Sequence, residues 1–453
     1  MYDFDVIVIG AGPAGYEVAS LLGAGGKSVC IVEKSESTVG GTCLNEGCVP
    51  AKNFLETSSY IKKAAYFESC GVSGNENKFN ITTLQKATNC LIQDLKVGIL
   101  GKLKKSKVTI EYDSASFVDN HTVKLESQDK NITAQDIVIA SGSSHRDHPL
   151  MSLEGETIIS SREVFKLSSI PKSILIIGGG AIGCEFASFF NALGSDVRIS
   201  EFAPKLVAHE DDDVSRTLKR ELEKNDISID LKANVTEYRV SEEGVEVTID
   251  TGKKQETQTF EKVLISIGRI PNTSVLHVEN ANIVEDRGFI EVDENLRCLN
   301  HDNIYAIGDV LKSPALAHVA YYEAKRVAQS ILDKDTFSGD YIFPSVTFCT
   351  PQIASIGKSE KALKEQEIKF KNKKLFFKTN AKAKIKGDDS GFIKVLFDEE
   401  TSLVLGASII GNDATELIHQ FLIAINAKLT MNDLEKMIFA HPTLSESTLD
   451  LIH

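Results

Sequence analysis

The chain has 453 residues, of which 42% are hydrophobic, and carries a formal net charge of −14 at pH 7. Its length predicts about three or four domains, and its acidity argues against nucleic acid as a partner, because phosphates would be repelled. No apolar run approaches the roughly 20 residues of a membrane-spanning helix. The first predicted strand begins at about Asp5 and leaves no room for a signal peptide. We therefore expect a protein of the cytoplasm, or of an organelle interior after processing.

The first predicted elements are a strand, a glycine-rich turn, a helix and a second strand, in VIVIGAGPAGYEVASLLGAGGKSVCIVEK. The same order recurs without gaps in ILIIGGGAIGCEFASFFNALGSDVRISEF. Three glycines of each copy align: Gly10, Gly12 and Gly15 with Gly178, Gly180 and Gly183. In such motifs one glycine makes the tight turn, one admits a pyrophosphate and one lets helix pack on strand. The repeat therefore predicts two Rossmann-like dinucleotide-binding domains in an α/β protein.

An acidic residue, Glu33 or Glu201, closes the second strand of each copy and is expected to bind ribose hydroxyls. At the second site this carboxylate would accept a free 2′-hydroxyl and repel a 2′-phosphate. Residues 202–204 supply no arginine for a phosphate, and Arg198 is expected to point elsewhere. The second site is therefore predicted to bind NAD in preference to NADP.

Only two of the eight cysteines, Cys43 and Cys48, are close neighbours, in GGTCLNEGCVPAK. On an ideal helix this spacing is beyond disulfide reach, so a bond would need a distorted segment, which Asn45 and Gly47 permit. A metal site would need a second ligand pair at short spacing, and the sequence has none, so no metal is predicted. Lys52 falls on the helical face of Cys48, where its charge would lower a thiolate pKa. A redox disulfide is favoured over an inert or metal-binding pair.

Residues 70–136 are predicted to form a helix and then a small sheet. Three later strands end in small residues, in IVIASGS, VLISIGRIPN and IYAIGDV, which would let a ligand approach closely. Asp309 in the last of these either binds a ribityl hydroxyl or caps the helix that follows, and taken alone the cap is favoured.

From about Tyr341 the pattern changes to strands followed by two helices, which predicts a separate α+β domain without a nucleotide site. The predicted strands are Val346–Phe348, Leu375–Phe377, Phe392–Phe397 and Leu403–Ile410.

The last motif is AHPTLSES, in which His441 could act as a base near neutral pH and Glu446 could orient it. The alternative is structural, because Thr443 to Glu446 also fits a capping box. The residues alone leave both interpretations open.

The cysteine segment, the two glycine motifs, IGRIPN, IYAIGDV, PALAH and HPTLSE occur in the order of the pyridine nucleotide–disulfide oxidoreductases, which the chain resembles over essentially its whole length. The resemblance implies an FAD-binding domain at 1–147 and an NAD-binding domain at 148–270. It further implies a central domain completing the FAD site at 271–340 and a dimerisation domain at 341–453.

The motif wording is most similar to the branch of this family that oxidises the dihydrolipoyl group of a lipoylated protein, with NAD as hydride acceptor. In that branch Cys43 would exchange with substrate, Cys48 would lie against the flavin, and His441 with Glu446 would serve the other subunit of a homodimer. Alternatives are an NAD(P)H-dependent reductase of another disulfide, such as glutathione disulfide, and a mainly structural flavoprotein subunit on the acyltransferase core of a 2-oxo acid dehydrogenase complex.

The resemblance also implies cofactor contacts, with Lys52 paired to Glu185 near the flavin. For FAD they are Gly10, Gly12, Gly15, Glu33, Lys34, Gly41, Thr42, Lys52, Ala115, Ser141, Gly142, Ser143, Asp309, Ala315, Leu316, Ala317 and His318. For NAD they are Gly178, Gly179, Gly180, Ala181, Ile182, Gly183, Cys184, Glu185, Glu201, Val235 and Gly268.

Overall fold

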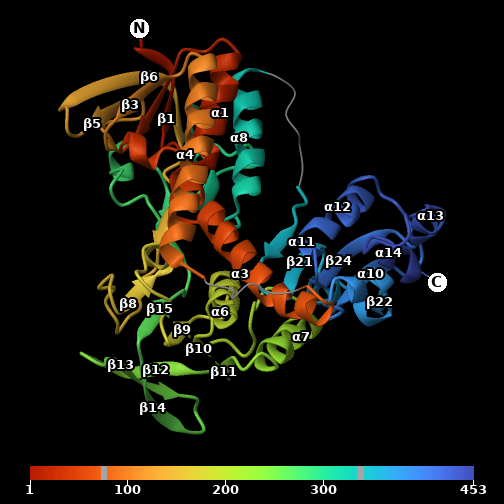
Figure 1. Ribbon diagram of the computed structural model, residues 1–453. Helices are drawn as coiled ribbons and strands as arrows, with labels where there is room; N and C mark the ends of the chain where they lie inside the picture. The colour runs from red at the N-terminus through yellow and green to blue at the C-terminus, as the bar shows by residue number, and fades with distance from the viewer. Residues whose placement is uncertain (73–78, 334–340, 453) are drawn as a thin grey trace. The chain divides into compact units, whose positions relative to one another are not determined.

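The computed structural model describes residues 1–72, 79–333 and 341–452 (Figure 1). Parts of two predicted segments, residues 73–78 and 334–340, and the terminal His453 lie outside the described residues. The chain forms two compact units, each built from three stretches of sequence. The first unit comprises Met1–Ala51, Thr83–Arg146 and Arg269–Asp340, and the second comprises Lys52–Thr82, Asp147–Gly268 and Tyr341–His453.

The first unit is built on a mainly parallel sheet in the order β3-β2-β1-β6. Strand β19 pairs parallel with β6, β5 pairs antiparallel with β6, and β4 pairs antiparallel with β5. Val6, Ile7 and Val8 are all fully buried, because a parallel strand is covered on both faces. Helices α1 and α8 lie side by side (Figure 1). The main elements are β1 (Phe4–Ile9), α1 (Pro13–Ala24), β2 (Val29–Glu33), α2 (Gly41–Glu46), α3 (Cys48–Ser69), which continues into the second unit, α4 (Ile81–Lys105), β3 (Thr109–Tyr112), β4 (Ala115–Phe117), β5 (Thr122–Leu125), β6 (Lys130–Ile139), β7 (Ser143–His145), β16 (Arg269–Pro271), β19 (Ile304–Ala306), η3 (Gly308–Val310) and α8 (Ala317–Ile331).

The second unit repeats this plan in a parallel sheet of order β11-β10-β9-β15-β8, and a three-stranded antiparallel sheet, β12-β13-β14, is inserted in the chain between β11 and β15. The two glycine-rich copies therefore both lie in parallel sheets, and the predicted α/β class is confirmed. The elements are β8 (Ile158–Ser160), α5 (Ser161–Val164), β9 (Ser173–Ile177), α6 (Ala181–Ala192), β10 (Asp196–Glu201), α7 (Asp212–Glu223), β11 (Ser228–Leu231), β12 (Asn234–Ser241), β13 (Gly244–Asp250), β14 (Gln255–Phe260) and β15 (Lys262–Ile265).

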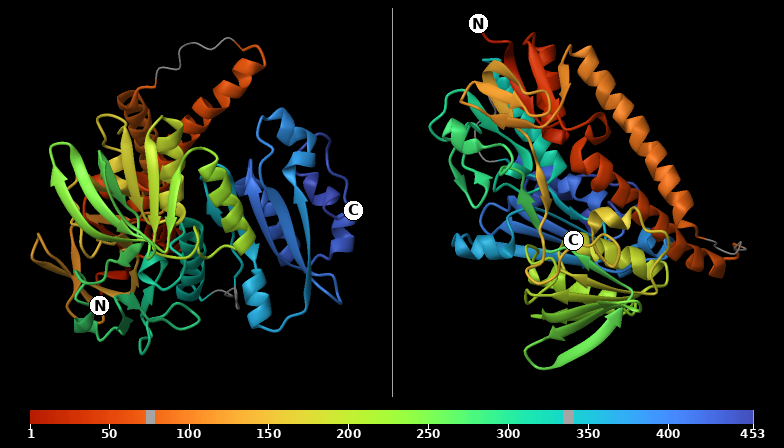
Figure 2. Two further views of the ribbon diagram at one scale, coloured as in Figure 1. Left: turned by 90° about the horizontal axis from the view of Figure 1, so that it is seen from below. Right: turned by 90° about the vertical axis from the view of Figure 1, so that its left-hand side faces the viewer.

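The C-terminal part of the second unit is an antiparallel sheet in the order β20-β21-β24-β23-β22. Helix α7 packs against β24, and α11 and α12 pack on β21 and β24 (Figure 2). The elements are β20 (Ser345–Thr347), β21 (Gln352–Gly357), α9 (Glu360–Glu365), β22 (Phe370–Phe376), α10 (Ala381–Ile385), β23 (Phe392–Asp398), β24 (Val404–Gly411), α11 (Ala414–Leu417), α12 (His419–Asn426), α13 (Met431–Glu435) and α14 (Ser447–Asp450).

The predicted α+β character of this part is confirmed, but two details were wrong. Strand β21 is additional to the four predicted strands, because its sequence QIASIG has too few apolar residues to mark it. Four short helices replace the two predicted after β24. One reason is Lys428, whose φ of 53° is left-handed and cannot continue a helix after α12.

No helix in the described ranges combines the length and the apolar character needed to cross a membrane.

Candidate active site

The first glycine-rich turn connects β1 to α1 and is closed by backbone contact. A Cβ atom on Gly15 would lie 1.8 Å from the carbonyl oxygen of Gly10, so only glycine allows this approach of helix to strand. Glu33 lies beside the turn, where its Oε2 accepts the N–H of Ala11 at 2.6 Å and its Oε1 accepts the hydroxyl of Thr38 at 2.7 Å. Oε1 also accepts the N–H of Lys34 at 3.0 Å, so Oε2 is the oxygen that keeps a further lone pair for a ribose hydroxyl.

The second turn, between β9 and α6, has the same construction. A Cβ atom on Gly183 would lie 1.9 Å from the carbonyl oxygen of Gly178. Glu201 accepts the N–H groups of Gly179 and Ala203, as Glu33 does for Ala11. The repeat seen in the sequence is therefore a repeat of hydrogen bonds as well.

Arg198, which lies near this second carboxylate in the sequence, is engaged elsewhere. Its guanidinium donates to Asp230 at 2.7 Å and to Glu256 at 3.0 Å, and those two carboxylates neutralise it. The prediction that Arg198 points elsewhere is confirmed, and the arginine is not free to bind a 2′-phosphate.

The cysteine segment has the predicted distortion. Cys43 lies in α2 and Cys48 begins α3, and Gly47 between them leaves helical geometry with φ −137° and ψ −113°. A Cβ atom on Gly47 would lie 2.9 Å from the carbonyl oxygen of Thr42, so a larger residue could not fold back in this way. The Asn45 amide donates to the carbonyl of Gly41 at 2.9 Å and fixes the turn. These contacts bring Cys43 and Cys48 close together.

The same segment is fastened to the first glycine-rich turn. Gly40 donates its N–H to the carbonyl oxygen of Ala11 at 2.9 Å. A Cβ atom on Gly41, where φ is 63°, would lie 2.6 Å from the Cα atom of Gly12. The two backbones cross in contact, so the cysteine pair is held beside the dinucleotide turn.

In the second unit, Lys52 on α3 is paired with Glu185 on α6. The Lys52 ammonium lies 3.1 Å and 3.0 Å from the two carboxylate oxygens, and Glu185 is 5% exposed. Glu185 also accepts the N–H of Phe348 at 2.9 Å, and the ammonium lies 4.7 Å from the centre of the Phe348 ring. The expected pairing of Lys52 with Glu185 is therefore confirmed.

The interpretation of Asp309 as a helix cap was wrong. Asp309 lies in the short helix η3, and its carboxylate accepts the hydroxyl of Ser143 at 2.5 Å. Arg269 donates to the same hydroxyl at 2.7 Å. The long helix α8 begins only at Ala317. The Asp309 carboxylate therefore binds Ser143, next to Arg269, and does not cap a helix.

His441 and Glu446 form a hydrogen-bonded pair, with Nδ1 and Oε2 2.8 Å apart. Glu446 also accepts the N–H of Thr443 at 3.2 Å, and the Thr443 hydroxyl accepts the N–H of Glu446 at 3.2 Å. One carboxylate therefore caps the turn and holds the histidine, so the capping interpretation is confirmed and the geometry also allows Glu446 to orient His441. The imidazole is 73% exposed and can be reached by another molecule.

Two tyrosines near the cysteines were missed in the sequence. The hydroxyls of Tyr16 on α1 and Tyr321 on α8 are hydrogen-bonded, with their rings edge to face and the ring centres 6.0 Å apart. Burial raises the pKa of both, and the negative charge of a Cys43 thiolate adds to the rise. Both phenols therefore stay protonated at neutral pH. Helical spacing from predicted cofactor contacts could have identified both tyrosines. Tyr16 follows Gly12 by four residues, and Tyr321 follows His318 by three.

Four of the six remaining cysteines are buried and unsuited to thiol–disulfide exchange. Burial raises the pKa of Cys30 and Cys298 to about 12, and it also raises the pKa of Cys184 and Cys349. The Cys184 thiol donates to the carbonyl of Gly179 at 3.4 Å, so its contact with NAD would be through the main chain. Thiol chemistry is thus left to more accessible cysteines, since the thiolate is the nucleophile.

The remaining predicted contacts fall into two groups. Ala115 and Val235 are buried in the cores of their units and could touch a cofactor only through the main chain. The others lie in turns or at the beginnings of helices, where N–H groups can face an anion. They are Lys34 after β2, Thr42 in α2, Ser141 and Gly142 after β6, Ala181 and Ile182 in α6, Gly268 after β15, and Ala315, Leu316, Ala317 and His318 around the start of α8.

Comparison with known proteins agrees with this geometry. Residues 4–324 match the pyridine nucleotide-disulphide oxidoreductase family, and residues 343–452 match the dimerisation domain of that family. The chain belongs to this family, and it is an oxidoreductase that uses FAD and NAD. The dimerisation domain supports a homodimer.

Particular relatives narrow the comparison. The chain is 33% identical to a dihydrolipoyl dehydrogenase of Haemophilus influenzae, over 98% of this chain and 93% of that protein. It is 35% identical to a dihydrolipoyl dehydrogenase of Chlamydia pneumoniae, over 98% and 95%. Among solved structures it is similar to the HOCl-induced flavoprotein disulfide reductase RclA from Escherichia coli, with 27% identity, a TM-score of 0.88 and 99% of each chain covered.

Two glycines of the second turn, three residues apart, predict opposite effects on NAD binding and on stability. In Gly180→Ala the new methyl group meets no described atom within 4 Å, and the φ of −75° suits alanine. We expect its Tm to be unchanged and its KM for NAD to rise by about tenfold, roughly 1.4 kcal/mol, because the methyl occupies the pyrophosphate space. Gly183→Ala should instead lower the Tm by several degrees, since overpacking costs about 1–3 kcal/mol. Thermal unfolding and NAD kinetics of both variants check this, and normal NAD binding by Gly180→Ala would contradict the assignment.

Proposed function

We propose that this protein is a dihydrolipoyl dehydrogenase, which oxidises the dihydrolipoyl group of a lipoylated protein with NAD as hydride acceptor. The observation that carries the proposal is the distorted cysteine segment held by Gly40 and Gly41 against the first glycine-rich turn. Such an arrangement places an exchangeable dithiol beside a bound dinucleotide. The named relatives, of nearly equal length, support the choice of substrate.

The residues of the first unit fit FAD. Gly12 faces Gly41 across the turn without a side chain, Glu33 offers a lone pair of Oε2 to a ribose, and Asp309 with Ser143 offers polar groups at the strand ends. FAD bound there would supply the two-electron chemistry that links oxidation of the dithiol to reduction of NAD. The protein contributes the positions of the groups and the charges around them.

The second unit would hold NAD at the turn that precedes α6. The N–H groups at the start of α6 face the pyrophosphate, and Glu201 receives the ribose hydroxyls. Arg198 is neutralised by Asp230 and Glu256, so this site lacks its guanidinium for a 2′-phosphate. The preference for NAD over NADP rests on these two features.

The exchange proceeds between sulfur atoms. A thiolate of dihydrolipoamide attacks Sγ of Cys43, the Cys43–Cys48 bond breaks, and Cys48 leaves as a thiolate. The second substrate thiol then attacks the substrate sulfur of the mixed disulfide, which releases oxidised lipoamide and the Cys43 thiolate. The disulfide is reduced by two electrons and the substrate is oxidised by two. Helix α3, which Cys48 begins, also carries Lys52, whose ammonium is held by Glu185.

His441 removes protons from the substrate thiols. Glu446 fixes the histidine through Nδ1, so Nε2 is left to accept a proton. We infer that the imidazole serves the active site of the second subunit, because it is exposed and lies in the dimerisation domain. The exposed apolar side chains of Ile423 and Ile438 on the same domain fit a surface covered by another copy.

We also propose that the protein works in the cytoplasm, or in the interior of an organelle after processing. Only one pair of the eight cysteines, Cys43 and Cys48, is close in the sequence, which suits a reducing compartment better than a secreted, disulfide-stapled fold.

The first test is anaerobic turnover of the purified yellow protein with dihydrolipoamide and NAD. Fast NADH formation is expected, with NADP poorly used and glutathione disulfide not reduced by NADH. Cys43→Ser should keep its flavin absorbance and lose dihydrolipoamide oxidation, because the exchange sulfur is gone. Retained turnover by this variant, or activity of the native protein with glutathione disulfide alone, would overturn the substrate assignment.

A second test separates the two roles of Glu446. His441→Gln should lower kcat/KM for dihydrolipoamide by about 10²–10⁴-fold, the usual contribution of a general base. Glu446→Gln keeps an oxygen that accepts the Thr443 N–H but loses the charge that polarises His441. It should retain the Tm and lose about tenfold in rate, a tenfold change being about 1.4 kcal/mol. The control is NADH oxidation by a quinone that takes electrons directly from the flavin, which neither variant should change.

A further inference from the structure

We propose that Lys394, in the dimerisation domain, is a positioning residue for the NAD site. It holds the end of the segment 202–211, the ribose loop, which follows Glu201 and connects β10 to α7. The proposal rests on the assignment of this turn and Glu201 to NAD under the proposed function.

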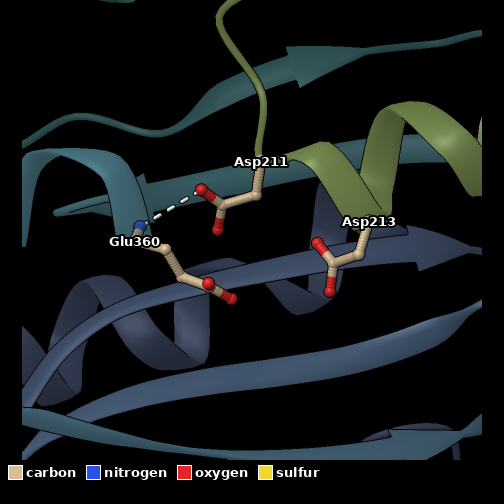
Figure 3. Close-up of side chains that lie close together, drawn as sticks. All are labelled: Asp211, Asp213 and Glu360. Atoms are coloured by element: carbon tan, nitrogen blue, oxygen red, sulfur yellow. Dashed lines mark hydrogen bonds between the residues drawn. The ribbon is translucent and has the colours of Figure 1, made fainter. Parts of the chain in front are cut away.

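Three carboxylates converge on one point, those of Asp211, Asp213 and Glu360 (Figure 3). The ammonium of Lys394 on β23 occupies that point, 2.8 Å from Asp211, 2.8 Å from Asp213 and 2.9 Å from Glu360. Lys394 is 1% exposed, so this charge is removed from water and depends on its three partners. An ammonium group has three N–H donors, and it takes the place that a metal ion would need.

Two of the three carboxylates come from the NAD-binding part of the chain and one comes from the dimerisation domain. Asp211 ends the ribose loop and Asp213 lies in the first turn of α7, whereas Glu360 begins α9 in the dimerisation domain. The N–H of Glu360 also donates to Asp211 at 3.1 Å. One residue earlier, the buried Glu210 accepts the hydroxyl of Ser355 on β21 at 3.0 Å. The dimerisation domain therefore fastens the end of the ribose loop through neighbouring residues.

The middle of the ribose loop lies directly on the dinucleotide turn. Val207 donates its N–H to the carbonyl oxygen of Gly179 at 2.8 Å. A Cβ atom on Gly179 would lie 2.4 Å from a methyl group of Leu206. The loop thus packs on the same glycine whose N–H is held by Glu201.

The backbone of the ribose loop is strained at this contact. Val207 has a φ of 40°, in the left-handed region that a β-branched residue adopts only when its surroundings enforce it. Its side chain is buried, and the Ser215 hydroxyl on α7 donates to the carbonyl of Leu206 at 2.8 Å. A strained loop relaxes when one end is released, so the anchorage at Asp211 and Asp213 maintains the shape at Gly179 and Glu201.

The charge-balanced variant Lys394→Gln/Glu360→Gln removes one positive and one negative charge from the cluster. Its matched control is Lys371→Gln/Glu399→Gln, which removes an exposed ion pair of 3.3 Å from the same domain. Lys394→Arg is the conservative variant: it keeps the charge and the fold, but a planar guanidinium cannot direct one donor from a single atom to each carboxylate. Glu201→Ala serves as the positive control for the NAD site.

The measurement is the Kd of each flavin-loaded protein for NADH, by fluorescence titration, together with the KM for NAD and for dihydrolipoamide. We expect the Kd for NADH to rise about tenfold in Lys394→Gln/Glu360→Gln and about threefold in Lys394→Arg. The KM for dihydrolipoamide and the flavin content should stay within twofold of the native values, and the control pair should change none of these.

A Kd within twofold of native in both Lys394 variants, while Glu201→Ala weakens NADH binding, would overturn the positioning role and leave the NAD site intact. A structural role alone would be indicated if the Lys394 variants raised the KM for NAD and the KM for dihydrolipoamide by the same factor, and if Lys394→Arg were as impaired as Lys394→Gln/Glu360→Gln. That result would overturn the positioning role. If Glu201→Ala also binds NADH normally, the NAD assignment falls and the proposal with it. If the double variant does not fold, Lys394→Arg alone decides, because its expected shift is confined to NADH.

Discussion

The structure depends on backbone approaching backbone without an intervening Cβ atom. Gly15 against Gly10, Gly183 against Gly178, and Gly41 against Gly12 are all closer than any side chain would allow. The first two contacts set each helix onto its strand, and the third places the cysteine segment on the first of these turns. Because interiors are close-packed, such contacts have no softer alternative arrangement. The positions of the dithiol and of both dinucleotide turns follow from them.

This constraint explains which features could be predicted. A position that requires glycine can be recognised in the sequence, because the requirement arises from the local backbone. The same holds for Asn45 and Gly47 between Cys43 and Cys48. The two parallel sheets and the distorted cysteine segment were therefore predictable. The pairing of Lys52 with Glu185 could be expected only through the family, because those residues are far apart in the chain.

Features created by tertiary contact could not be predicted in the same way. Lys394 lies in an apolar strand and has no neighbour in sequence that marks it as buried and charged. Its partners come from segments 34 and more than 180 residues away. Asp309 was misread because a short acidic turn before a helix suggests a cap, whereas the hydroxyl of Ser143, 166 residues distant, determines its role.

Glu446 supports the fold of its turn through Thr443 and orients His441 through its other oxygen. On the proposed function, selection for folding and selection for turnover would both act on this side chain. A library of variants screened only for soluble expression would still retain an oxygen acceptor at this position, glutamate or glutamine, even in molecules whose histidine had been lost. On the proposed function, persistence of this acceptor along a lineage would be no record of retained catalysis, which only the histidine beside it would carry.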